Sequence, residues 1–215
     1  MPLPFLLLIH WACLWGVFCR SPLTPSAYRK GALGMGAAIW LCMGGQLLLL
    51  WRADTLTAAA ALPFHLCSFC GFITLPALMK KYRPLWEMML FLGLPGALGA
   101  LLFPCPAESP WQDLMNFCFL SLHCLLVIAP LLPLGVGMRP SRHPRGALLW
   151  ANALLLMAAL ANRLFDANFL FLRWAPPGTP LAFFHRWGAP GYVMWLEGLA
   201  VLLLWRPWRK KTASS

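Results

Sequence analysis

The sequence predicts an all-α fold, a polytopic membrane helix bundle with seven transmembrane helices. Three observations predict it: 60% of the 215 residues are hydrophobic, only 11% are charged, and the apolar residues form long runs with the charges in the gaps. A membrane-spanning helix needs about 20 apolar residues, whereas soluble domains carry about 25% charged residues between shorter apolar segments. We expect a single transmembrane bundle over residues 1–205 and a short basic cytoplasmic tail over residues 206–215.

Seven apolar runs predict the spans. In chain order they are Pro2–Cys19, Gly31–Trp51, Ala58–Met79, Leu85–Phe103, Leu114–Leu134, Ala147–Leu172 and Ala189–Trp205. The first has no preceding basic residue and no small-residue cleavage site, so we interpret it as a span and not as a signal peptide. The sixth exceeds one bilayer thickness, so we expect its last turns to tilt or to emerge. Proline and glycine inside the spans indicate kinks and close helix approach.

The loop charges predict the orientation. Lys and Arg gather after the first, third and fifth spans and in the tail, while the loop after the fourth span holds Glu108 and Asp113. Positive loops stay in the cytoplasm, so the N-terminus should be outside and the C-terminus inside, in the cell inner (plasma) membrane. The formal net charge of +11 is split among these short loops, which argues against a nucleic-acid partner.

Eight cysteines are present, and nearly all lie in or beside apolar runs, so we expect no disulfide framework. Cys67 and Cys70 form a C-x-x-C pair on one helical face, a pattern that binds metal or cycles a disulfide in other proteins. Both lie deep in the third predicted span, and no further ligands accompany them. The sequence therefore predicts no metal site and no cofactor.

Polar residues inside spans indicate a site, because they are costly in lipid and face the bundle interior. At a rise of about 1.5 Å per residue, Cys67 and His123 each lie roughly 14 Å from the outer ends of their spans, and Glu197 roughly 12 Å along the seventh. His65, two residues from Cys67, points elsewhere on a helix. A thiol needs a base to become a nucleophile, so Cys67 and His123 are the predicted catalytic pair.

Glu197 or a backbone carbonyl should then hold the other ring nitrogen of His123. The alternative is a buried thiol and a histidine bonded to a backbone carbonyl, with no shared chemistry.

The end of the sixth predicted span carries a second polar cluster. Asn162 and Asp166 share a helical face, and Arg163 is close enough in sequence to pair with Asp166. The cluster is either a solvated helix end with an internal salt bridge or a clamp for a lipid headgroup or substrate. The predicted substrate-binding residues are His65, Asn162, Asp166, Asn168 and Glu197.

Several segments together resemble the YwaF-type bacterial integral membrane proteins. They are Leu62–Cys67, Gly96–Ala100 with Pro104, His123, Asn162, Asn168–Leu172 and Tyr192. YwaF-type proteins are similar to a eukaryotic group of transmembrane acyltransferases that moves acyl chains between phospholipids through an acyl-cysteine. More distantly they resemble androgen-induced membrane hydrolases, which use a threonine and a histidine on separate spans. The resemblance implies a nucleophile at Cys67 and a base at His123. Phe169 replaces the family's usual tyrosine, so its phenol is absent here.

The expected function is lipid acyl transfer or ester hydrolysis at an intramembrane Cys/His site, with membrane lipids as partners. One alternative is a small-solute transporter or binder in which His65, His123 and Glu197 line a path. Transporters are often built from inverted halves, and we find none in this sequence. Another alternative is a non-catalytic membrane assembly factor.

Overall fold

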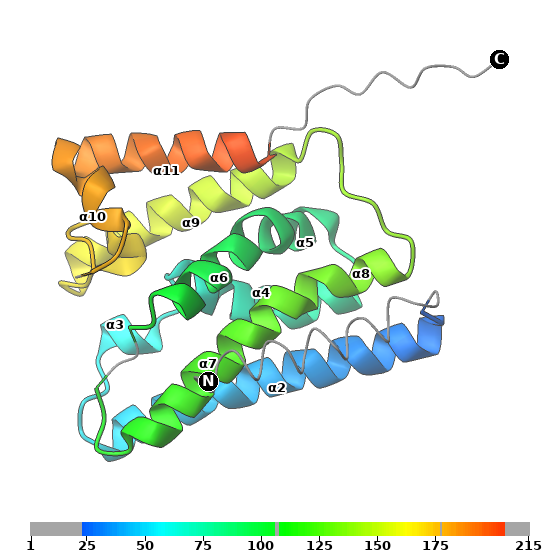
Figure 1. Ribbon diagram of the computed structural model, residues 1–215, viewed down its shortest axis with the longest axis horizontal. Coiled ribbons are helices and arrows are strands. Elements are labelled where there is room, and N and C mark those ends of the chain that lie inside the picture. The colour runs from blue at the N-terminus through cyan, green and yellow to red at the C-terminus, as the bar shows by residue number, and fades with distance from the viewer. Residues whose placement is uncertain (1–22, 106–107, 177, 205–215) are drawn as a thin grey trace.

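The computed structural model describes residues 23–105, 108–176 and 178–204, and within these ranges it contains helices and no strand (Figure 1). The predicted first span and the predicted basic tail lie outside the described residues. The long helices are α2 (Pro25–Arg52), α4 (Leu66–Met79), α7 (Gln112–Ile128), α9 (Arg145–Leu164) and α11 (Gly188–Leu204). Between them lie α3 (Ala58–Ala61), α5 (Arg83–Met88), the π-helix η1 (Met89–Gly93), α6 (Leu94–Leu102), η2 (Ala129–Leu131), α8 (Leu132–Gly135), η3 (Phe169–Phe171), α10 (Leu181–Phe184) and η4 (His185–Trp187).

Four of the described helical segments are long and apolar enough to cross a membrane. They are Pro25–Arg52, Arg83–Leu102, Gln112–Gly135 and Arg145–Leu164. The prediction of an all-helical, multi-pass membrane protein is confirmed at this level, while seven spans and their orientation stay predictions.

Figure 1 shows α9 and α11 side by side along one edge of the molecule, with α2 and α7 at the opposite edge. The shorter helices α4, α5 and α6 lie between them, where α5 contacts α9 and α4 contacts α2. The centre is filled by large apolar side chains, and Trp86 is fully buried there with its Nε1–H donating to the Pro130 carbonyl at 2.7 Å.

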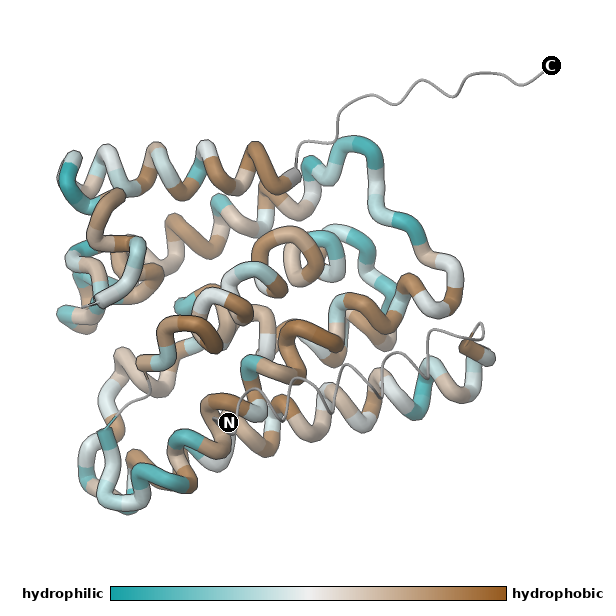
Figure 2. Tube along the Cα trace, viewed as in Figure 1, coloured by the Kyte–Doolittle hydropathy of each residue, from teal (hydrophilic) through white to brown (hydrophobic). Residues whose placement is uncertain are grey.

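Many outward-facing side chains are apolar as well, and Figure 2 shows hydrophobic stretches along α9 and α11. Leu41, Leu149 and Leu156 are all more than two thirds exposed, at 76%, 71% and 72%. A soluble monomer rarely exposes so much large apolar surface, whereas lipid-facing helices must.

The third predicted span is wrong as a single helix. α3 ends at Ala61, Leu62 is extended with ψ of 135°, and α4 begins only at Leu66 after His65 with ψ of 148°. Pro63 explains the break, because proline lacks a backbone N–H and disfavours helical geometry in the residue before it. The 14 residues of α4 extend only about 21 Å at 1.5 Å per residue, less than a hydrocarbon core of about 30 Å.

The sixth predicted span is too long. α9 ends at Leu164, and the chain then turns through residues that include Asp166, Leu170 and Phe171 with φ of 47°, 53° and 54°. Such left-handed angles are uncommon for residues other than glycine and are held by surrounding structure. We call residues 165–174 the α9 loop. The apolar residues of this loop extend the predicted span to Leu172, because hydrophobicity alone does not distinguish a helix from a buried loop.

The close approach predicted for the fourth span is present. The π-helix η1 ends two residues before Pro95, consistent with a proline that removes one helical hydrogen bond. A Cβ added to Gly93 would lie 2.7 Å from the Cys70 sulfur, and one added to Gly96 would lie 2.9 Å from Leu66. Glycine therefore lets α4 pack directly against η1 and α6.

We expect Gly146→Ala to destabilise the bundle by about 1–3 kcal/mol through overpacking. A Cβ at this position would lie 2.9 Å from both Cβ and Cγ of Pro84, whose ring cannot rotate away. Thermal unfolding in detergent measures the effect. Gly44→Ala is the matched control, since nothing lies within 4 Å of its added Cβ and alanine is the better helix former. Equal unfolding midpoints for the two variants would contradict this account.

A second prediction tests the orientation. A reporter fused after Ser215 should read cytoplasmic, because positively charged loops are retained on that side. A reporter placed at Glu108 should read external. A cytoplasmic reading at Glu108 would reverse the side on which the candidate site opens.

Candidate functional site

Cys67 lies in the first turn of α4, two residues after the N-cap His65. The backbone N–H groups of a first helical turn have no partner within the helix, and this end of the helix dipole is positive. The sequence had placed Cys67 in the middle of a continuous helix, where no such end exists. The break at Pro63 therefore places the thiol in the first turn of a helix and not in the middle of one.

Cys70 occupies the next turn and is almost completely buried, with its sulfur against Gly93. Both cysteines are free thiols. Within the described ranges, no group of three or more His, Cys, Asp or Glu residues is arranged to hold a metal ion.

His123 lies on α7 and is buried, with 5% of its surface exposed. Its Nδ1 is 2.7 Å from the backbone carbonyl of Phe119. A carbonyl only accepts hydrogen bonds, so Nδ1 is the protonated nitrogen and Nε2 carries the free lone pair of the neutral ring. A backbone carbonyl was one of the two partners predicted for this nitrogen.

The neighbours of His123 on α7 contact two other helices. Leu122 lies 3.7 Å from the Cβ position of Gly71 on α4, and Cys124 packs in a cluster with Leu101 of α6. His123 itself packs against the ring of Phe119, with centroids 4.2 Å apart.

In the described part of the chain no hydrogen bond links Cys67 to His123, so their pairing stays a prediction. The prediction that Glu197 lies at the same depth in the membrane as Cys67 and His123 also stays a prediction. The Glu197 carboxylate on α11 accepts a hydrogen bond from Asn152 Nδ2 of α9 at 3.4 Å, and Asn152 also donates to the Leu148 carbonyl at 3.0 Å.

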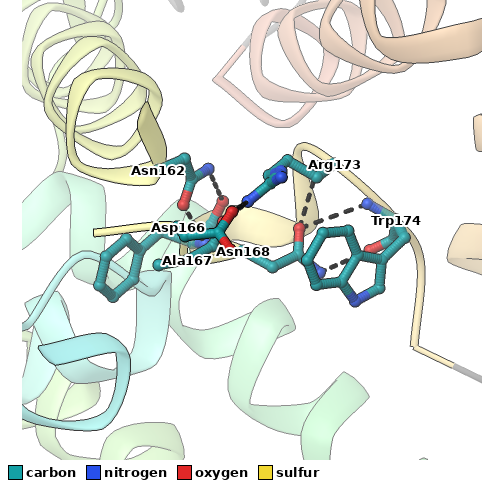
Figure 3. A network of polar contacts seen from close by, with 7 residues as sticks. Asn162, Asp166, Ala167, Asn168, Arg173 and Trp174 are labelled. Carbon is teal, nitrogen blue, oxygen red and sulfur yellow. Dashed lines mark hydrogen bonds and ion pairs between the residues drawn. The ribbon is translucent and has the colours of Figure 1, made fainter. Parts of the chain in front are cut away.

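Asn162 holds the α9 loop through both halves of its amide. Its Nδ2 donates to the Phe169 carbonyl at 3.1 Å, and its Oδ1 accepts from the Phe169 N–H at 2.6 Å (Figure 3). Both residues are buried, so these bonds satisfy two backbone groups that water does not reach. Asn162 therefore fixes the position of Phe169.

Asn168 closes the second half of the loop. Its Nδ2 donates to the Trp174 carbonyl at 2.8 Å, and its Oδ1 accepts from the backbone N–H groups of Arg173 and Trp174 at 2.9 and 3.3 Å (Figure 3). The sequence suggests an ion pair between Asp166 and Arg163. In the structure Asp166 pairs with Arg173 instead. The reason is the early end of α9, after which the loop returns Arg173 to the side of Asp166.

Two residues from outside the α9 loop also hydrogen-bond to its backbone. His185 Nε2 is 2.7 Å from the Phe171 carbonyl, and the Tyr192 hydroxyl donates to the Leu170 carbonyl at 3.1 Å. Their rings stack with centroids 4.0 Å apart. His185 begins η4 in a stretch of sequence with no recognisable motif, so only the fold brings it to residues with left-handed φ angles. Tyr192 was part of the family resemblance.

His65 connects the loop to α4. Its ring centroid lies 5.4 Å from that of Phe169 and 5.2 Å from that of Phe171. Four of the predicted substrate-binding residues thus belong to one assembly around the α9 loop, next to the first turn of α4: His65, Asn162, Asp166 and Asn168.

Comparison with known proteins gives one match. The model of the TMEM164 family matches residues 1–206, nearly the whole chain. No curated protein and no solved structure matches. The match covers the predicted catalytic and substrate-binding residues, whereas the likeness to YwaF-type proteins stays a prediction. By the extent of this match, the chain belongs to the TMEM164 family, a family of transmembrane proteins.

Proposed function

We propose that this protein transfers or hydrolyses the acyl group of a membrane lipid ester, with Cys67 as the nucleophile and His123 as the base. The observation that carries the proposal is the break at Pro63, which puts Cys67 in the first turn of a helix within an apolar region. The buried His123, with Nδ1 bonded to a carbonyl and Nε2 free, supplies the second requirement.

The chemistry has two balanced steps. The Nε2 of His123 takes the proton of the Cys67 thiol as the sulfur attacks the ester carbonyl carbon, forming a C–S bond. The ester C–O bond breaks, and the departing alcohol takes the proton from His123. In the second step a lipid hydroxyl or water gives its proton to His123 and attacks the thioester. The C–S bond breaks, and the thiolate recovers the proton.

The remaining predicted residues take supporting roles in this proposal. Asn162 acts as a positioning residue, because both its amide groups are bonded to Phe169. His65 and the rings of Phe169 and Phe171 form an aromatic wall beside Cys67 for the acyl donor. Glu197 bonds to Asn152 of α9, apart from this assembly, and takes no part in the two steps.

The test is to trap the acyl-enzyme. Purified protein incubated with a lipid carrying a labelled acyl chain should acquire a hydroxylamine-sensitive label, which peptide mass analysis should locate on Cys67. Cys67→Ser should lose that label and Cys70→Ser should keep it. Label on Cys70 would contradict the assignment of Cys67 as the nucleophile. A Cys67–Cys70 disulfide in the resting protein would contradict the proposal and favour redox chemistry.

A further inference from the structure

A groove of about 740 Å³ lies between the carboxyl end of α9 and the amino end of α11. Its α9 side presents Asn162 and Arg163, and the α9 loop adds Asp166 and Arg173. Its α11 side is apolar, with residues such as Ala189 and Val193. Ligand pockets usually occupy about 300–1,000 Å³, so the groove is large enough for a lipid headgroup.

The charges in the groove are not balanced. Arg173 is committed to the Asp166 carboxylate and also lies over the Trp174 ring, 5.0 Å from its centroid. Arg163 makes no hydrogen bond or ion pair with any other residue that the structure describes. The two guanidinium groups and one carboxylate leave a net charge of +1. The ends of α9 and α11 carry opposite partial charges of about one half, so they do not change this sign.

We infer that this groove binds the phosphate of a membrane lipid headgroup, with Arg163 as its main anchor. A guanidinium binds phosphate oxygens through two parallel N–H donors, and this geometry suits a phosphate ester better than a neutral headgroup. Arg173 provides a second contact when it exchanges Asp166 for the ligand.

The groove's composition favours a lipid over a soluble phosphate. One wall is charged and the other is apolar, and the adjoining surface exposes Leu160 and Phe165, at 57% and 48%. A lipid places its phosphate beside apolar chains, which matches this division. The groove shares Asn162 with the assembly that contains His65, the N-cap residue of the helix that carries Cys67.

This inference deepens the proposed function and relies on it for the choice of a lipid ligand. Binding is therefore measured in a Cys67→Ala background, where acyl transfer cannot occur. The probes are dioleoyl phosphatidic acid, dioleoylglycerol and glycerol 3-phosphate, each added to protein in maltoside micelles, which contain no phosphate. Native mass spectrometry or thermophoresis gives the affinities.

We expect phosphatidic acid to bind more tightly than dioleoylglycerol, and Arg163→Gln to weaken its binding by about tenfold. Arg163→Lys, which keeps the charge, should lose less. Asp166→Asn should strengthen binding by roughly threefold by releasing Arg173, and asparagine tolerates the left-handed φ at this position. Arg186→Gln is the matched control at the same end of the molecule, outside the groove.

Equal affinities of folded Arg163→Gln and the parent protein would overturn the inference, as would equal binding of phosphatidic acid and dioleoylglycerol. Binding of glycerol 3-phosphate as tight as that of phosphatidic acid would overturn the lipid assignment. Acyl labelling of Cys67 in the otherwise unchanged protein is a separate measurement. If no acyl label appears on Cys67, the proposed function is rejected, while the measured preference for a phosphate headgroup still stands.

Discussion

His123→Ala should abolish acyl labelling of Cys67, lowering the labelling rate by at least about 100-fold. The substitution removes the imidazole that the proposed mechanism uses to accept the thiol proton. The Nδ1–carbonyl bond to Phe119 reserves Nε2 for this role, so no tautomeric rearrangement is needed. Quenched-flow or timed labelling followed by mass analysis of the Cys67 peptide measures the rate.

Two control variants separate a catalytic effect from a structural one. His65→Ala should reduce labelling less, because its ring packs on Phe169 and Phe171 and is not required as a base. His143→Ala, in a loop, should leave the rate unchanged. A folded His123→Ala protein that labels at the parent rate would remove His123 from the mechanism.

Asn162→Ala should have the largest effect on stability among the substitutions of polar residues, roughly 2–5 kcal/mol at the α9 loop. It leaves the N–H of Phe169 without a partner and its carbonyl with only the bond from the Leu172 N–H at 3.3 Å, and Phe169 is fully buried. An unsatisfied buried backbone group costs about 1–3 kcal/mol, and a lost hydrogen bond costs about 0.5–1.5 kcal/mol more. Amide hydrogen exchange over residues 165–174, together with thermal unfolding, measures the loss.

Partial and surface variants make this prediction specific. Asn162→Asp still accepts from the Phe169 N–H but cannot donate to its carbonyl, so it should lie between alanine and the parent. Asn152→Ala, whose bonds are on an exposed part of α9, should change stability little. If the backbone amides of residues 165–174 exchange equally fast in Asn162→Ala and Asn152→Ala, the side-chain amide of Asn162 is not what holds the loop.

The sequence was sufficient for the fold class and for most helix positions, because composition and apolar run length decide both. The seventh predicted span, Ala189–Trp205, nearly coincides with α11, and the fourth with the helical run Arg83–Leu102. α2 begins six residues before its predicted start because the Thr24 side chain caps it, accepting from Ala27 N–H at 3.2 Å, and Pro25 fits its first turn. That signal was present and was outweighed by the nearby charges.

The site could be predicted only in part, since its geometry depends on where helices stop. Pro63 was visible, but a proline in an apolar run produces either a kink or a complete break, and packing decides between them. The loop bonds of Asn162 were not predictable, because they require Phe169 to leave the helix. His185 had no local pattern at all and reaches Phe171 only through the tertiary fold.

The extended segment between α3 and α4 lies outside the helical hydrogen-bond ladders, and within a bilayer such backbone must be covered by protein or reached by water. Here the rings of Phe64 and Phe169 meet edge to face with centroids 5.4 Å apart and cover it. In the proposed mechanism, loss of this contact would admit water to the first turn of α4 and would favour hydrolysis of an acyl-cysteine over its transfer to a lipid alcohol.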